Sequence, residues 1–159
     1  MERRGLSETQ MQEQIGGALV VAVDASPRAA VALRFAAELA VRTGSALHVL
    51  LVWNLIIGPA PDATPGQPAT EQDRQAEAER VLSVFVEQAL ADSDRPTLHL
   101  HAVHGNVDSL LESISRAAQH LIVGSRGRGG VAGLLLGSTS GHLVSHARCP
   151  ITVVPSGRD

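Results

Sequence analysis

The chain has no lysine, no tyrosine and only one cysteine among its 159 residues, and its 13 basic residues are all arginines. A Walker A phosphate loop needs its lysine, and so does Schiff-base or pyridoxal chemistry, so these three classes are excluded. The single cysteine, Cys149, excludes an internal disulfide and a thiolate metal cluster. We therefore expect a protein of the reducing cytoplasm.

Aromatic residues are also scarce, at 2% of the chain, and the net charge is -3. Both observations argue against a nucleic-acid partner, because such partners favour basic surfaces and single-stranded ones stack on aromatic rings. Apolar runs such as 46–52 are too short to cross a membrane, and the polar residues 1–14 do not resemble a secretion signal. Hydrophobic residues make up 44% and charged residues 18%, which is typical of one globular domain.

Short apolar runs alternate with helical patterns along the chain. The runs that predict strands are 18–23, 46–53, 97–103, 120–123 and 151–154. Four helices are expected. The first has Ser26 as N-cap, Pro27 as first helical residue and Gly44 at its end, and the second begins at Thr70. The other two are expected over 107–118 and 138–147. This alternation predicts an open, mostly parallel α/β sheet with helices on both faces.

The N-terminal end of this pattern and one internal segment are less regular. Residues 1–16 lack a strong apolar period and are expected to form a mobile tail or a short extra helix. Residues 54–69 are rich in proline and glycine and predict a loop. We expect a single domain over residues 17–156.

Ligands of open α/β sheets bind beyond the carboxyl ends of the strands, where the strand order reverses. Asp24, residues 52–54 and residues 124–127 all lie at the carboxyl ends of predicted strands. These three segments are therefore the candidate site. An ordinary role for Asp24 in starting the next helix is the alternative.

The segment from Gly124 to Ser140 combines features that suit a phosphate group. Its glycines let backbone N–H groups approach closely, Arg126 can supply positive charge, and three hydroxyl residues lie at the start of a predicted helix. Residues 113–158 contain five arginines and no acidic residue, which also favours an anion. The plain alternative is that the glycines only make a tight loop and the hydroxyls only cap the helix.

Two other motifs fit this region less well. Residues 127–132 match a loose G-x-G-x-x-A dinucleotide pattern, but no acidic residue follows until Asp159 to hold the ribose. Residues 137–141 resemble a nucleophile elbow with Thr139 in place of serine.

Histidines occur at spacings that a metal ion could use. They are His99, His101 and His104 on a predicted strand and its end, and His142 and His146 one helical turn apart. No carboxylate or thiolate nearby in the sequence completes the first set. We therefore interpret the first three as a partly exposed strand face and the pair as groups on a helix surface.

Gly124-x2-Gly127-x9-Gly137-Ser138 resembles the G-x2-G-x9-G-[S/T] signature of the universal stress protein family, in its ATP-binding branch. The resemblance covers residues 17–155. It includes Val-Ala-Val-Asp24-x-Ser26, the strand ending at Val52 and the closing Pro-Ile-Thr-Val-Val-Pro155. It implies a five-stranded parallel sheet in the order 3-2-1-4-5, Rossmann-like and similar to the adenine nucleotide alpha hydrolase fold.

The resemblance also implies a nucleotide site. Asp24 would hydrogen-bond the ribose or adenine of ATP, and Ala22 and Val52 would flank the base beside Val123. The phosphates, with or without Mg²⁺, would be held by one set of residues: Gly124, Arg126, Gly127, Gly137 and Ser138, with Thr139 and Ser140 beside them.

The resulting hypothesis is a cytoplasmic, ATP-binding stress-response regulator that hydrolyses ATP slowly at most, since no general base is evident. The resemblance implies a homodimer, and the last strand suits that role because a short β-branched edge strand invites pairing with a second copy. That strand comprises Ile151, Thr152, Val153 and Val154, and Pro150 and Pro155 limit its length. The alternative is a dimerisation or scaffold module that binds no nucleotide.

Overall fold

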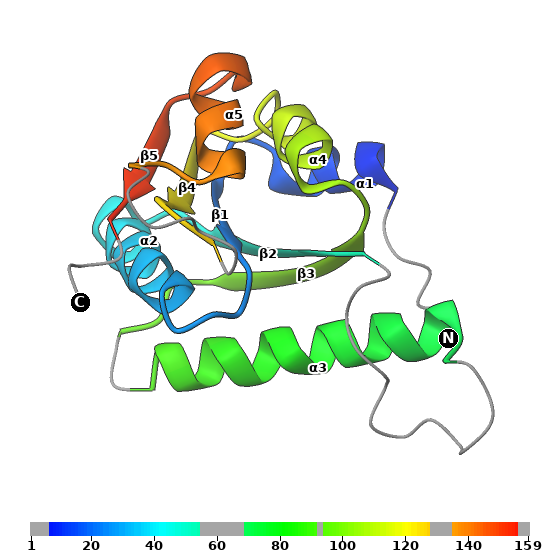
Figure 1. The fold of residues 1–159 in the computed structure, drawn as a ribbon. Coiled ribbons are helices and arrows are strands. Elements are labelled where there is room, and N and C mark those ends of the chain that lie inside the picture. Colours follow the sequence, from blue (N-terminus) through cyan, green and yellow to red (C-terminus); the bar gives the residue numbers. More distant parts are fainter. Residues whose placement is uncertain (1–6, 55–68, 92–93, 128–134, 156–159) are drawn as a thin grey trace.

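Five parallel strands form one sheet in the order β3-β2-β1-β4-β5 in the computed structural model, which describes residues 7–54, 69–91, 94–127 and 135–155 (Figure 1). The strands are β1 (Leu19–Val23), β2 (Leu47–Trp53), β3 (Leu98–His104), β4 (His120–Gly124) and β5 (Ile151–Val154). The helices are α1 (Glu8–Ile15), α2 (Ala29–Thr43), α3 (Glu71–Ala89), α4 (Val107–Ile114) and α5 (Ser138–His146). The predicted fold class and strand order are confirmed.

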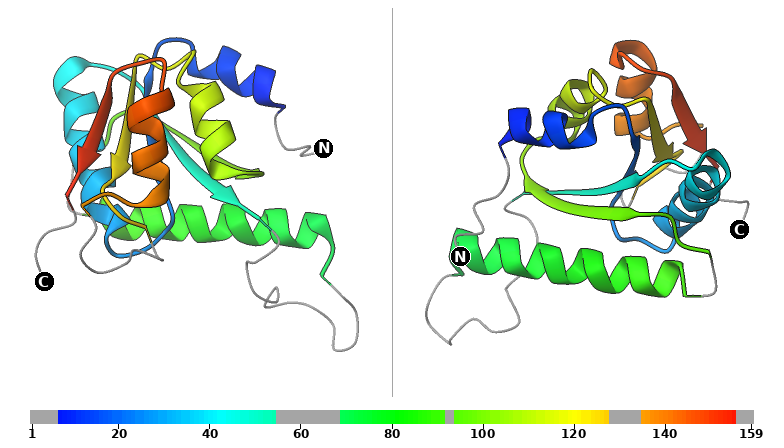
Figure 2. Two further views of the ribbon diagram at one scale, coloured as in Figure 1. Left: turned by 45° about the horizontal axis from the view of Figure 1, so that its top comes forward. Right: turned by 180° about the vertical axis from the view of Figure 1, so that it is seen from behind.

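Helices cover both faces of this sheet, so the molecule has three layers (Figures 1 and 2). Helices α2 and α3 pack on one face in one hydrophobic cluster, and α1, α4 and α5 pack on the other face in a second cluster. Side chains alternate between the faces along each strand. On β2, Val49 and Leu51 join the first cluster while Leu50 and Val52 join the second. Burial on both faces explains why the strands are nearly continuous apolar runs.

Helix α1 is an addition before the first strand, and it is one of the two forms expected for the N-terminal residues. Ser7 and Gln10 make a reciprocal capping box at its start. Met11 and Ile15 are fully buried against the face shared with α4. The Gln12 side chain donates to the backbone oxygen of Ser113 at 3.0 Å. These contacts make α1 part of the folded structure.

Two predicted helix boundaries were wrong. Helix α2 begins at Ala29, after a turn in which the N–H of Ala29 donates to the backbone oxygen of Ser26, so Pro27 precedes the helix. Helix α4 ends at Ile114, because the next residues form tighter turns in which the N–H of Ala117 donates to Ile114. The capping box between Thr70 and Asp73 at the start of α3 is present as expected.

Strand β1 lies in the middle of the sheet, and its position determines where a ligand crevice can form. The chain moves from β1 to β2 and β3 on one side, then crosses to β4 and β5 on the other. The carboxyl ends of β1 and β4 therefore lie at the point where the strand order reverses, where a crevice forms. None of the described helices is long and apolar enough to cross a membrane.

Candidate functional site

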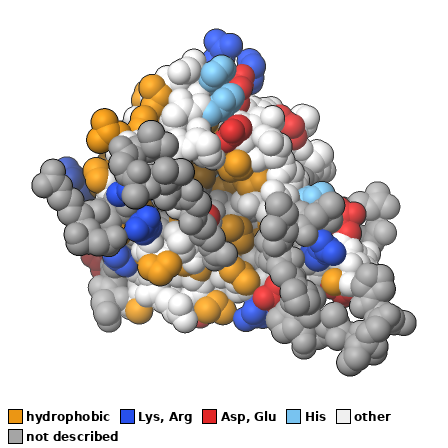
Figure 3. Space-filling model, in the orientation of Figure 1, with side chains coloured by type: hydrophobic (Ala, Val, Ile, Leu, Met, Phe, Trp, Pro, Cys, Tyr) orange, Lys and Arg blue, Asp and Glu red, His pale blue; other side chains and the backbone are white. Residues whose placement is uncertain are grey.

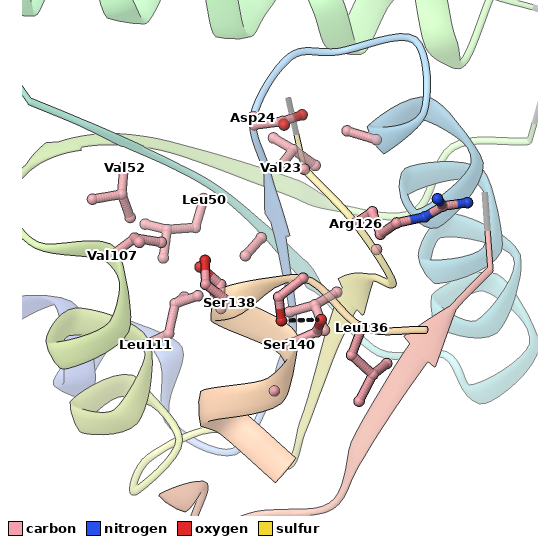
Figure 4. A pocket seen from close by; sticks show the side chains of 18 residues that line it. Val23, Asp24, Leu50, Val52, Val107, Leu111, Arg126, Leu136, Ser138 and Ser140 are labelled. Carbon is pink, nitrogen blue, oxygen red and sulfur yellow. Dashed lines mark hydrogen bonds between the residues drawn. The ribbon is translucent and has the colours of Figure 1, made fainter. Parts of the chain in front are cut away.

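A cavity of about 620 Å³ opens at the carboxyl ends of β1, β2 and β4 (Figure 4). The residues assigned to the nucleotide by the family resemblance all line it: Ala22, Asp24, Val52, Val123, Gly124, Arg126, Gly127, Gly137, Ser138, Thr139 and Ser140. Within the candidate segments 52–54 and 124–127, Trp53, Asn54 and Ser125 do not line it. Segments more than a hundred residues apart in the sequence thus meet at one place. The volume lies within the range usual for pockets that hold small molecules.

The cavity also has lining residues that the sequence analysis did not single out: Val23, Ala29, Leu50, Val107, Leu111, Leu136 and Gly141. Leu50 was detectable, because it lies two residues before Val52 on the same face of β2. Val107 and Leu111 lie one turn apart on α4, which starts immediately after β3. Together with Val52 they form an apolar wall on one side of Ser138 (Figure 4).

Close contacts join the two described ends of the glycine-rich segment of residues 124–137, which we call the glycine loop. The N–H of Gly137 donates to the backbone oxygen of Ser125 at 2.6 Å. A Cβ added at Gly137 would lie 3.4 Å from the Arg126 Cα and 3.5 Å from the Ser125 oxygen. Gly137 therefore lies beside Arg126 and Gly127, which brings the start of α5 to the end of β4.

Ser140 reinforces this closure from inside the protein. Its side chain is 3% exposed, and its hydroxyl donates to the backbone oxygen of Ser125 at 3.0 Å, with Gly137 oxygen as a second acceptor at 3.2 Å. The hydroxyl thus has partners within the loop (Figure 4). Ser138 differs, because it is exposed and is the first residue of α5.

The start of α5, like that of α2, lacks the side-chain cap that α1, α3 and α4 have. Ser7, Thr70 and Asn106 cap those helices, whereas Gly137 precedes α5 without a side-chain hydrogen bond. Gly141 is the first residue whose N–H donates back within the helix, to Gly137 oxygen. The N–H groups of the preceding residues of the first turn have no acceptor within the helix, and they lie at a cavity. A helix start of this kind attracts anions.

Asp24 forms the opposite side of the cavity, at the end of β1. Its Oδ1 accepts a hydrogen bond from the N–H of Ser26 at 3.0 Å, across Ala25, whose φ is 58°. A left-handed backbone at alanine is uncommon and places this turn under local strain. The Oδ2 of Asp24 would lie 3.2 Å from a Cβ at Gly127. A glycine at position 127 therefore lets the β4 loop pass close to the carboxylate.

Asp24 and Arg126 are the charged residues among the described lining. The Arg126 guanidinium extends away from Ser138 and Ser140 (Figure 4). Its predicted contact with a phosphate stays a prediction, and it requires the side chain to turn. Asp24 Oδ1 holds the turn before α2 by accepting from the N–H of Ser26, but it does not cap the helix, which begins at Ala29 without a side-chain cap.

The histidines that the sequence placed at metal-compatible spacings do not form a metal site in the part of the chain described. No group of three or more histidine, cysteine, aspartate or glutamate side chains there is arranged to hold a metal ion. His142 and His146 lie stacked on α5, and His142 Nε2 is 3.2 Å from Glu112 Oε2 on α4. His99 and His104 are exposed as expected, but His101 is buried, contrary to the interpretation of this strand face.

The chain is similar to known proteins of one family. The model of the universal stress protein family matches residues 17–155. A universal stress protein of Mycobacterium tuberculosis is 32% identical over 157 residues, covering 90% of this chain and 49% of that protein. The chain therefore spans about half the length of this relative.

Solved structures show the same fold. Universal stress protein UspA from Lactobacillus plantarum is 22% identical, with a TM-score of 0.67 over 87% of this chain and 97% of that one. A universal stress protein from Archaeoglobus fulgidus, solved in complex with dAMP, is 26% identical, with a TM-score of 0.53 over 89% of this chain and 98% of that one.

Proposed function

The chain belongs to the universal stress protein family, and on that premise we propose that its cavity binds an adenine nucleotide, ATP in particular. In this proposal the protein is a stress-response regulator whose nucleotide occupancy is its signal. The observation that carries the proposal is the start of α5, which has no side-chain cap. It lies in one cavity with the glycine loop and with the apolar wall that includes Val52 and Val107. The dAMP complex of the Archaeoglobus relative supports the same class of ligand.

The phosphates are assigned to the start of α5 and to the loop after β4. Backbone N–H groups of Ser138 and Thr139 have no acceptor within the helix, and the helix dipole favours negative charge there. Gly124 and Gly127 leave room for the phosphates beside the backbone, and the Ser138 hydroxyl adds a donor. Ser140 acts by holding the loop in place through Ser125.

The base and ribose are assigned to the side of the cavity that β1, β2 and α4 form. Ala22, Leu50, Val52 and Val107 provide an apolar wall on which an adenine ring can lie. Asp24 is placed to accept a hydrogen bond from the ribose or the adenine. Its negative charge makes it a poor neighbour for bare phosphate, which is a second reason to place the phosphates at α5.

We assign Mg²⁺ as a partner of ATP in the site. A triphosphate carries several negative charges, and the described lining has one cationic side chain, Arg126, to balance them. The metal would neutralise phosphate charge when bound. Phosphate oxygens are its main ligands in this proposal, and Asp24 is the carboxylate among the described lining. No residue is assigned to activate water, so we expect slow hydrolysis at most.

The same proposal includes a homodimer through β5. Strand β5 is a sheet edge, and its Ile151, Thr152 and Val153 are only half-buried. Val144 on α5 is 57% exposed close by in the sequence, and hydrophobic side chains gather over this side of the molecule (Figure 3). An unpaired edge next to apolar side chains favours pairing with a second copy.

Titration calorimetry of nucleotide-free protein with ATP, AMP and adenosine tests the ligand proposal, with and without Mg²⁺. We expect saturable binding of ATP, weaker binding of adenosine, and release of an adenine nucleotide from freshly purified protein in mass spectrometry. Folded protein that binds none of the three at millimolar concentration would instead identify a scaffold module.

A further inference from the structure

Three histidines gather on the sheet, from the amino ends of β2 and β3 to the middle of β3. His48 lies on β2, and His99 and His101 lie on β3. The register pairs His48 with His99 and Leu50 with His101, so the alternation of side chains places all three imidazoles on the face covered by α1 and α4. His48 is 3% exposed and His101 is 8% exposed. Buried polar side chains of this kind need a partner.

The partner of each buried imidazole is the other one. His48 Nδ1 and His101 Nε2 are 2.9 Å apart, and the two ring planes are parallel to within 1°. Their ring centroids are 5.1 Å apart, much farther than the bonded nitrogens, which is the geometry of two imidazoles hydrogen-bonded end to end. The His99 ring lies against His48, with centroids 4.6 Å apart.

This hydrogen bond depends on protonation. A neutral imidazole carries one N–H donor and one acceptor nitrogen, so two neutral histidines form one N–H···N bond. A first added proton can go to an outer nitrogen and leave that bond in place. When both rings are protonated, both facing nitrogens carry hydrogen, so the bond is lost and two positive charges face each other.

Among the described residues, the hydrogen bonds and ion pairs join no carboxylate to His48 or His101, and Asp108 Oδ1 on α4 is buried without a hydrogen-bond partner. The charged side chains on the covering helices are Glu8 and Glu13 of α1, both exposed, and Asp108 and Glu112 of α4. On α5 the titratable groups are His142 and His146, and Glu112 already contacts His142. Burial, followed by the charges of His101 and His99, lowers the pKa of His48 to about 4, and burial followed by His99 lowers the pKa of His101.

We propose that the His48–His101 pair is an acid-sensitive latch that joins the edge strand β3 to β2 when both rings are neutral and opens when both are protonated. Because these rings are harder to protonate in the folded state than in the unfolded chain, acid favours unfolding. The stability linked to this pair is therefore fully present above the unfolded pKa of 6.5 and falls as the pH drops below it toward about 4, because the unfolded chain takes up protons that the folded pair excludes. Nucleotide binding plays no part in this proposal.

Urea unfolding followed by circular dichroism between pH 7 and pH 5 tests the latch. In the wild-type protein, His48 alone should raise the unfolding equilibrium constant about 20-fold over this range. We expect the double variant His48→Leu/His101→Leu to lack at least this part of the pH dependence. The matched control is His146→Gln, on an exposed histidine of α5, which should keep it.

Wild-type protein alone provides a second test that does not depend on the double variant folding. Ring-proton NMR titration of the seven histidines should show two that titrate clearly below the ordinary range. The single variants His48→Gln and His101→Gln assign those two signals. The latch is refuted if all seven titrate near pH 6.5, or if the double variant keeps the full wild-type pH dependence.

Discussion

Gly127→Val is expected to weaken ATP binding at least tenfold, about 1.4 kcal/mol, while the protein remains folded. An added Cβ at this position would lie 3.2 Å from Asp24 Oδ2, closer than ordinary van der Waals contact. Asp24 has little freedom to retreat, because its Oδ1 is held by the N–H of Ser26. Valine also adds two methyl groups to that Cβ, so either the carboxylate or the loop after β4 must move.

The size of the effect follows from what moves. A hydrogen bond to a charged group contributes about 1.5–3 kcal/mol, so displacing the carboxylate from the ribose or adenine is enough for the tenfold loss. Any crowding of the phosphates adds to it. Gly127→Ala should give an intermediate loss, since its single Cβ requires a shift of only a few tenths of an ångström.

Titration calorimetry with ATP measures the affinity, and circular dichroism confirms that each variant is folded. Gly105→Ala is the matched control, because a Cβ there meets nothing within 4 Å and Gly105 does not line the cavity. We expect it to bind ATP like the wild type. A folded Gly127→Val protein with unchanged ATP affinity would show that the loop does not hold the nucleotide.

Three further predictions concern charge, assembly and the N-terminal helix. Arg126→Ala should weaken ATP much more than adenosine in calorimetry, because a guanidinium interacts with phosphate charge; equal losses would assign Arg126 to loop structure. Val153→Pro removes a donor from the middle of the edge strand β5 and should give monomers at micromolar concentration in sedimentation. A monomeric wild type, or a dimeric variant, would refute this interface. Met11→Ala should lower the free energy of unfolding by roughly 2–5 kcal/mol in urea, because Met11 is fully buried; a change within about 0.5 kcal/mol would show that α1 is undocked in solution.

The fold was largely predictable because its strands are buried on both faces. Such strands read as unbroken apolar runs, and glycine or proline marks their ends, so all five were found. Helix boundaries were less predictable. The first turn of α2 depends on how Ser26 bonds back to Asp24, and α4 ends where residues 115–117 tighten to meet β4. These are local competitions between hydrogen bonds of similar energy.

The candidate site was predictable where one segment carries it and less so where segments meet. Gly124, Gly127 and Gly137 stand out in the sequence because their spacing matches the G-x2-G-x9-G signature. The side of the cavity made by Val107 and Leu111 was missed, since nothing local distinguishes these residues from core leucines and valines. Sequence reasoning also gave Ser138 and Ser140 the same role, although Ser138 is exposed and the buried Ser140 donates to Ser125.

The sequence by itself determined the α/β class, the alternation of strands and helices, and the position of the glycine loop after the fourth strand. These properties depend on the spacing of apolar residues along the chain and on the positions of glycine, and both can be seen in short stretches of sequence. Only the tertiary structure decided that Ser140 turns its hydroxyl to Ser125, that Asp24 lies against Gly127, and that His48 bonds to His101. The two histidines are 53 residues apart, and each contact depends on strand register and helix rotation. Packing of the whole core sets these, so no local pattern encodes them.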